Sequence, residues 1–89
     1  MKRLRIIVKG KVQGVYFRAT TETVATTLEL TGFVRNERDG SVYIEAQGNE
    51  EPLARFVEWC KRGPERAKVE ELLIEEIIEM EEDGFTMRR

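Results

Sequence analysis

The chain carries at its centre the stretch Gly32-Phe33-Val34-Arg35-Asn36-Glu37-Arg38-Asp39-Gly40-Ser41-Val42-Tyr43-Ile44-Glu45-Ala46, which decides the fold. Two runs rich in β-branched and aromatic residues, 33–36 and 41–46, flank the dipeptide Asp39-Gly40, which favours a tight hairpin turn. A hairpin pairs its strands antiparallel, so the sheet that contains it is expected to be mainly antiparallel.

One strand and one helix are predicted before the hairpin. Residues 4–9 alternate in polarity, with Leu4, Ile6 and Val8 on one face of a strand. Gly10 and Gly14 are expected to bracket the turn that follows. Apolar residues in 18–29 approximate helical spacing, but several threonines weaken the helix by propensity, so packing must hold it.

A second helix is the clearest element of the sequence. Its apolar stripe falls at i, i+3, i+4 and i+7 and consists of Leu53, Phe56, Val57 and Cys60. Asn49 is the expected N-cap, and Gly63-Pro64 is expected to end the helix. The exposed side carries two predicted i,i+4 ion pairs, Glu51–Arg55 and Glu58–Arg62.

The segment 69–80 is compatible with a helix or a strand. Some apolar residues have helical spacing, but the three isoleucines and the need to close the sheet favour a strand, irregular around Glu75-Glu76. Asp83-Gly84 then predicts a turn into a short last strand, 85–87. This order predicts an α+β, ferredoxin-like β-α-β-β-α-β sandwich with an extra C-terminal strand and two helices on one face of a mainly antiparallel sheet.

Length and composition fit a single domain over residues 1–89. No apolar run is long enough to span a membrane, no signal peptide is recognised, and a single cysteine, Cys60, favours a reducing compartment. With a net charge of −2 as well, we expect a cytoplasmic monomer that binds neither membranes nor nucleic acid. The charged fraction of 36 % and the scarcity of Asn and Gln favour a thermophilic source.

Several kinds of chemistry are excluded by the residues that the sequence lacks. Without histidine there is no imidazole base or histidine metal site, and one cysteine cannot form a thiolate zinc cluster. The sequence has no Gly-x-x-x-x-Gly-Lys-Ser/Thr motif for nucleotide binding. We therefore expect no metal and no cofactor.

The segment Gln13-Gly14-Val15-Tyr16-Phe17-Arg18 joins the first strand to the first helix. A helix N-terminus offers free backbone N–H groups to anions, and an arginine adds a planar fork suited to phosphate oxygens. Residues 1–45 carry eight Lys and Arg against five Asp and Glu, so an anion is drawn to this half of the chain. The segment predicts a phosphate site, and the structural alternative is that Arg18 only pairs with Glu22.

Asn36 is a second candidate because it places a carboxamide near the end of a predicted strand. A neutral amide both donates and accepts hydrogen bonds, so it can orient a water molecule. The structural alternative is that Asn36 satisfies backbone groups of the hairpin turn.

The two phrases occur together and in order. Gly10-x-Val12-Gln13-Gly14-Val15-x-Phe17-Arg18 followed by Ala25-x-x-Leu28-x-Leu30-x-Gly32-Phe33-Val34-Arg35-Asn36-x-x-Asp39-Gly40 closely resembles the acylphosphatase family, over the whole chain. The resemblance implies a metal-independent hydrolase that splits acyl phosphates into a carboxylate and phosphate. It implies that Asn36 orients the attacking water and that phosphate is bound by Gln13, Gly14, Val15, Tyr16, Phe17 and Arg18.

The chain departs from the family pattern at two positions. Tyr16 stands where the family often has a small residue, and we expect it to narrow or shield the mouth of the pocket. Glu29 stands in place of a common glycine after Leu28, so the helix end is expected to find another way to turn.

Two features of the sequence point to functions of other classes. The segment 60–66 matches the Cys-x-x-Gly-x-x-Arg skeleton of a cysteine phosphatase loop, with Cys60, Gly63 and Arg66 at the defined positions. Cys60, however, is expected at the C-terminal end of a helix, where the negative end of the helix dipole disfavours a thiolate. The same strand and helix order also occurs in RNA-binding and regulatory domains. RNA recognition requires exposed aromatic residues on the central strands, and the strand 41–46 offers only Tyr43.

Overall fold

The computed structural model describes residues 1–89 and contains five strands and two helices. In chain order these are β1 (Lys2–Lys11), α1 (Phe17–Thr27), β2 (Thr31–Asn36), β3 (Val42–Gly48), α2 (Glu50–Cys60), β4 (Lys68–Ile77) and β5 (Phe85–Met87). This order confirms the predicted α+β, ferredoxin-like arrangement with an extra C-terminal strand.

The five strands form one sheet in the order β4-β1-β3-β2-β5. Every neighbouring pair is antiparallel except β2 and β5, which run parallel. The predicted hairpin joins β2 to β3, with Val34 opposite Ile44. Its turn is held by Asp39 Oδ1, which accepts hydrogen bonds from the Ser41 N–H at 2.9 Å and the Ser41 hydroxyl at 2.6 Å.

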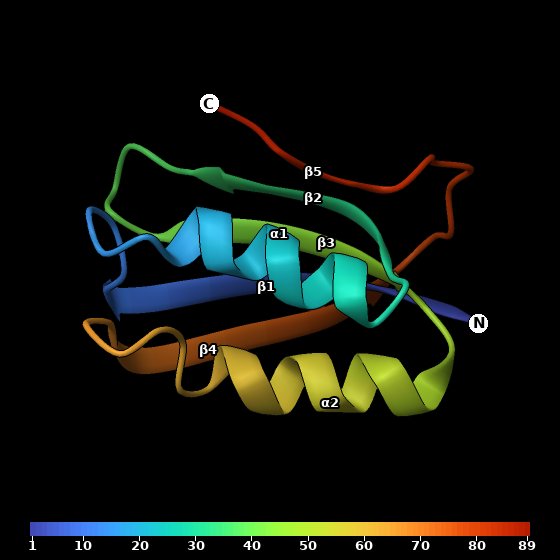
Figure 1. Ribbon diagram of the computed structural model, residues 1–89, viewed down its shortest axis with the longest axis horizontal. Helices are drawn as coiled ribbons and strands as arrows, with labels where there is room; N and C mark the ends of the chain where they lie inside the picture. Colours follow the sequence, from blue (N-terminus) through green and yellow to red (C-terminus); the bar gives the residue numbers. More distant parts are fainter.

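Both helices lie on the same face of the sheet (Figure 1). The core between the helices and the sheet includes the predicted residues Ile6, Val8, Leu53, Phe56 and Cys60. The aromatic rings of α2 extend this core, since the Trp59 ring lies 5.5 Å from the Phe17 ring. Neither helix is long and apolar enough to cross a membrane.

The ends and exposed side of α2 follow the sequence in part. Asn49 occupies the N-cap position, but its side chain makes no capping hydrogen bond. Arg55 pairs with Glu51 at 2.7 Å as predicted. Glu58 instead pairs with Lys61, three residues ahead, at 2.7 Å, so the predicted pair with Arg62 is wrong.

β4 is regular where an irregularity was predicted. It pairs continuously with β1 through Glu75-Glu76, and Arg5 Nη1 forms an ion pair with Glu75 at 2.6 Å across the two strands. The irregularity lies nearer the start of β4, where Lys9 pairs with Glu71 and Gly10 pairs with Val69, so that Glu70 is an extra residue that forms a bulge. Gly10, with φ +130°, lies opposite this bulge inside β1 and does not begin the following turn.

Arg3 is fully buried on the face of the sheet that the helices leave free. Its guanidinium donates to Glu45 Oε1 at 2.9 Å, Gln47 Oε1 at 3.3 Å and Glu82 Oε1 at 2.8 Å. Glu45 and Gln47 belong to β3, whereas Glu82 belongs to the segment between β4 and β5. Arg3 therefore ties this connecting segment to the sheet.

The side chain of Gln47 holds the same connecting segment by binding the backbone of that segment. Its side-chain Nε2 donates to the Met80 carbonyl at 3.0 Å, and the Met80 N–H donates to Gln47 Oε1 at 2.9 Å. The segment then enters β5, and beyond it the Arg88 N–H donates to the Val34 carbonyl at 2.8 Å. These contacts fix where β5 lies along the edge of β2.

The end of α1 uses the ordinary left-handed turn without a glycine. Glu29 has φ +60°, and two hydrogen bonds close the turn, from the Glu29 N–H to the Thr26 carbonyl at 3.0 Å and from the Leu30 N–H to the Ala25 carbonyl at 2.9 Å. This is the Schellman arrangement that usually has glycine at the left-handed position. The expectation of another way to turn is therefore wrong, because the chain accepts the strained conformation at a glutamate.

Replacing Glu29 should relieve this strain. A left-handed conformation costs an L-residue about 1–2 kcal/mol, and a glycine at this position avoids that cost. The larger conformational entropy of glycine in the unfolded state offsets part of the stabilisation. We expect Glu29→Gly to raise the free energy of unfolding in urea by about 0.5–1 kcal/mol. Glu29→Ala removes the same charge but keeps the strain, so an equal gain in that variant would contradict the explanation.

Removing the Arg3 guanidinium should destabilise the fold in a pH-dependent way. Burial alone would raise the pKa of Glu45, but hydrogen bonds from Tyr43 and Arg3 outweigh it and hold that pKa below its ordinary value of 4.5. The stabilisation is therefore present above the ordinary pKa and lost as the pH falls through the lowered one. We expect Arg3→Met to cost about 3 kcal/mol at pH 7 in urea unfolding, and progressively less as the pH is lowered below 4.5.

The matched control is Arg55→Met, which breaks the exposed ion pair with Glu51 on α2 and should cost about 1 kcal/mol or less. Equal losses for the two variants, or a loss in Arg3→Met that does not change with pH, would rule out the buried ion pair as the cause.

Candidate active site

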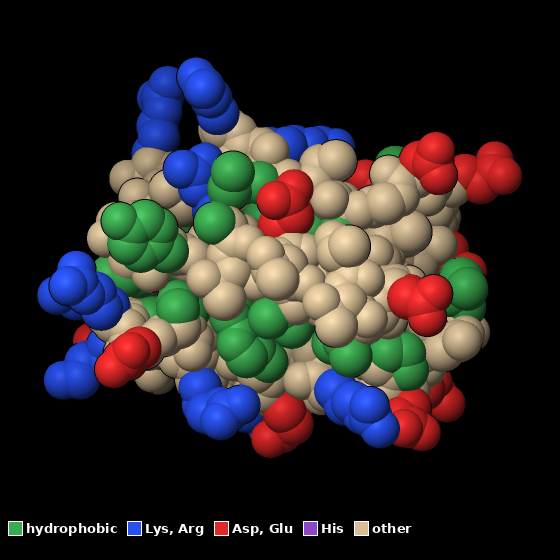
Figure 2. Space-filling view, viewed as in Figure 1, with side chains coloured by type: hydrophobic (Ala, Val, Ile, Leu, Met, Phe, Trp, Pro, Cys, Tyr) green, Lys and Arg blue, Asp and Glu red, His purple; other side chains and the backbone are tan.

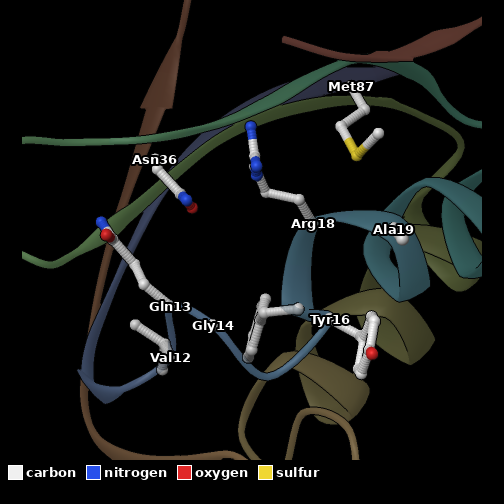
Figure 3. Close-up of a pocket in the computed structure, with 9 residues that line it drawn as sticks. Val12, Gln13, Gly14, Tyr16, Arg18, Ala19, Asn36 and Met87 are labelled. Carbon is white, nitrogen blue, oxygen red and sulfur yellow. The ribbon is translucent and has the colours of Figure 1, made fainter. Parts of the chain in front are cut away.

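A cavity of about 400 Å³ lies between the β1–α1 loop, the end of β2 and β5 (Figure 3). Its lining residues are Val12, Gln13, Gly14, Tyr16, Phe17, Arg18, Ala19, Asn36 and Met87. All predicted site residues except Val15 thus line one cavity. The Val15 side chain is buried in the core, so only its backbone can serve the site.

The loop before α1 has an alternating backbone conformation. Gly14 has φ +74° and Tyr16 has φ +63°, while Val15 between them does not have a positive φ. Left-handed residues are frequent in loops whose successive N–H groups turn toward the same side, and such loops form concave anion sites in proteins. Gly14 adopts this conformation without strain, whereas Tyr16 adopts it at a cost.

The N–H groups of this loop have no acceptor within the protein. No backbone N–H from Gly14 to Ala19 donates a hydrogen bond to another residue. Tyr16 occupies the N-cap position of α1, and no side chain caps the helix. The start of α1 therefore presents several free donors and the positive end of the helix dipole at the cavity.

Arg18 points its guanidinium toward the cavity from the first turn of α1 (Figure 3). Its Nη1 donates to the Arg88 carbonyl at 2.8 Å, and its other N–H groups have no partner in the protein. Arg18 forms no ion pair with Glu22, so that structural alternative is wrong. The contact with Arg88 fixes the side chain and leaves most of its donors for a ligand.

Asn36 is the last residue of β2, and its side chain points into the same cavity (Figure 3). Its carboxamide makes no hydrogen bond to another residue, in contrast to the alternative that it satisfies the hairpin turn. That turn is instead satisfied by Asp39 and Gln13. The Asn36 amide is therefore free to bind a water molecule or a ligand.

Gln13 has a role that the sequence did not indicate. Its Nε2 donates to the Glu37 carbonyl at 2.7 Å and to the Ser41 carbonyl at 2.9 Å, which uses both of its amide hydrogens. The side chain therefore joins the β1–α1 loop to the hairpin directly after Asn36. Only the backbone of Gln13 remains available for the predicted phosphate contact.

Tyr16 lines the cavity without closing it. Its side chain is 76 % exposed, and Figure 3 shows the ring directed away from the space between Asn36 and Arg18. The expectation that Tyr16 shields the mouth is therefore not met in this conformation. The ring lies at the rim, near Ala19.

Met87 and Arg88 complete the site and were not predicted to do so. β5 pairs parallel with β2, so Met87 lies opposite Val34 and Arg88 reaches Arg18. A short terminal strand carries too little sequence information to indicate its partner. The fixed pairing of β5 is what brings the end of the chain to the first turn of α1.

Charge is distributed unevenly over the molecule. Figure 2 shows Lys and Arg side chains gathered mainly at the end where the β1–α1 loop lies, and Asp and Glu side chains mainly at the opposite end. No group of three or more acidic or cysteine side chains is arranged to hold a metal ion. The field at the cavity therefore favours an anion.

Cys60 lies outside this cavity. It is fully buried at the C-terminal end of α2, and burial raises the pKa of its thiol. A thiol held neutral in the core is not a nucleophile, so the resemblance to a cysteine phosphatase loop has no structural basis.

The chain is similar in sequence to known proteins over most of its length. A sequence model of the acylphosphatase family matches residues 4–87. The chain is 51 % identical over 77 residues to an acylphosphatase of Marinobacter nauticus, and this match covers 86 % of this chain and 84 % of that protein. It is 43 % identical over 88 residues to an acylphosphatase of Thermotoga maritima, which covers 99 % of this chain and 98 % of that protein.

A solved structure shows the same relationship. The crystal structure of acylphosphatase from Bacillus subtilis matches with a TM-score of 0.95 and 39 % identity, over 100 % of both chains. The fold is therefore shared as well as the sequence. The protein belongs to the acylphosphatase family.

Proposed function

We propose that this enzyme hydrolyses the carboxyl–phosphate bond of acyl phosphates without a metal, with Arg18 and the loop backbone as the phosphate site and Asn36 as the residue that orients water. The observation that carries this proposal is the convergence of three unsatisfied groups on one cavity. These are the free N–H groups of the loop, the guanidinium of Arg18 and the carboxamide of Asn36.

The phosphoryl group is bound by donors that are already in place. The backbone N–H groups from Gly14 to Arg18 have no acceptor in the protein and belong to a segment that lines the cavity, and the guanidinium adds two parallel donors and a full positive charge. Charge on the phosphoryl oxygens is thereby stabilised without reorganisation of the site. A lysine could supply the charge but not the planar fork.

The water is oriented by Asn36 for attack on phosphorus. The new P–O bond forms from the water, the bond between phosphorus and the acyl oxygen breaks, and the carboxylate leaves with the electron pair. Because a carboxylate is a good leaving group, the reaction needs little acid catalysis. A phosphoryl oxygen takes the proton of the water, since no side chain of the cavity is a base at neutral pH.

The proposal also includes a monomeric protein in the cytoplasm. All the residues of the site belong to one chain, and the only cysteine is buried and unpaired, as is usual in reducing compartments.

A binding module without catalysis has less support. The aromatic residues on the free face of the sheet are engaged by cations, because the Arg35 guanidinium lies 4.4 Å from the Tyr43 ring and that of Arg88 lies 3.7 Å from the Phe33 ring. Tyr43 also donates its hydroxyl to Glu45 at 2.7 Å. RNA recognition on such a sheet needs aromatic faces that are free to stack with bases.

Removing each of the two proposed catalytic side chains should have a different effect on phosphate binding. With acetyl phosphate as substrate and phosphate release as the measurement, we expect Arg18→Ala and Asn36→Ala each to lower kcat/KM by about a hundredfold or more. Calorimetric titration with inorganic phosphate should show binding lost in Arg18→Ala and retained in Asn36→Ala. Phosphate release by either variant at the rate of the unmodified protein would refute the role assigned to that residue.

The rate should depend little on pH or on chelators. Arginine stays protonated and asparagine does not ionise between pH 5 and 8, so neither changes its charge in this range. We expect kcat/KM for acetyl phosphate to be nearly constant over this range and unchanged by EDTA. A bell-shaped profile or a requirement for magnesium would contradict the proposed mechanism.

A further inference from the structure

We propose that Met87, Ala19 and Tyr16 form an acyl-binding surface beside the phosphate site, which makes uncharged, apolar acyl phosphates the preferred substrates. This inference rests on the proposed function and names the part of the substrate that the phosphate site does not hold. It is carried by the direction of the reaction, the size of the cavity and the character of its rim.

The direction of the reaction places the acyl group opposite Asn36. In a displacement at phosphorus, the attacking and leaving oxygens lie roughly in line. If Asn36 holds the water, the acyl oxygen leaves on the far side of phosphorus. Figure 3 shows Asn36 and Met87 on opposite sides of the Arg18 guanidinium, with Ala19 on the same side as Met87.

The cavity is larger than a phosphoryl group requires. Its volume is about 400 Å³, whereas one water molecule in the liquid occupies about 30 Å³. A phosphoryl group with three free oxygens therefore leaves most of the space unfilled. The remaining space adjoins β5 and the first turn of α1.

The rim next to this space is apolar and exposed. Tyr16 is 76 % exposed and Met87 is 45 % exposed, and Ala19 between them carries only a methyl group. Single exposed apolar side chains are ordinary, but several around one cavity mark a surface that binds a ligand. Methionine adapts its shape and makes favourable contacts with aromatic rings.

Two nearby arginines are already engaged. Arg18 serves the phosphoryl group in the proposed function. The Arg88 guanidinium lies 3.7 Å from the centre of the Phe33 ring and 3.8 Å from Glu82, so it is held on the other side of β5 from Met87. A carboxylate on the acyl group would therefore lose water without gaining a partner from either of these two arginines.

The test compares benzoyl phosphate with acetyl phosphate in the full chain. Intrinsic reactivity differs between these substrates but is the same for every variant, so the ratio of their kcat/KM values isolates contacts with the acyl group. We expect Met87→Thr to lower the benzoyl-to-acetyl ratio by about fivefold. A fully buried apolar contact discriminates more strongly between substrates, and Met87 is about half exposed. Ala19→Leu should raise the ratio, because it enlarges the same surface.

The matched control is Met80→Thr, the same substitution at a methionine that is 54 % exposed and does not line the cavity. Its ratio should equal that of the unmodified protein. A third substrate, 4-carboxybenzoyl phosphate, adds a charge to the same ring and should be hydrolysed with lower kcat/KM than benzoyl phosphate.

The outcomes separate this inference from the proposed function. Failure of the unmodified protein to hydrolyse any of the three substrates would refute the proposed function itself. Hydrolysis with equal ratios in Met87→Thr, Ala19→Leu and Met80→Thr would overturn only the acyl-binding surface. Preference for the charged substrate would overturn the assignment of an apolar acyl group.

Discussion

The buried guanidinium of Arg3 is the interaction on which the rest of the structure depends. It joins β1 and β3 at the centre of the sheet to Glu82 in the segment before β5. Because β5 has only three residues, its place on β2 depends on how that segment is held. The Arg88 carbonyl that fixes Arg18 follows directly after β5. A charge cluster on one face of the sheet thus determines the geometry of a cavity near its edge.

The two non-glycine residues with left-handed backbones have different roles. Tyr16 lies in the loop whose free N–H groups border the cavity, so its strain accompanies the arrangement that we propose binds an anion. Glu29 lies at the other end of α1 and only reverses the chain toward β2. Strain is therefore connected to function at the first position and to chain direction at the second.

Much of the fold could be predicted because its signals are local. The Asp39-Gly40 turn lies between two clear strands, and the stripe from Leu53 to Cys60 follows helical spacing. The approach of Arg18 to Asn36 was predicted through the resemblance to a family and agrees with the shared cavity.

The features that the sequence did not predict depend on contacts between distant segments. Strand alternation places Arg3 on the face without helices, but only the segment around Glu82 makes that position buried. The parallel pairing of β5, and with it the place of Met87, has no local signal. The hydrogen bonds of the Gln13 side chain to the hairpin were not predicted, because the distance between the two segments is not visible in the sequence.

The long reach of the Arg3 contact also has a consequence for how the molecule forms. Arg3 and Glu82 are 79 positions apart, and Arg18 and Arg88 are 70 apart. Contacts at such separations form slowly, because closing a long loop costs conformational entropy before the new contacts stabilise the chain. A chain in which β5 has not yet joined β2 lacks the carbonyl that holds Arg18, so we expect it to be inactive even if the hairpin and both helices have formed. Return of activity after dilution from denaturant therefore reports the docking of β5.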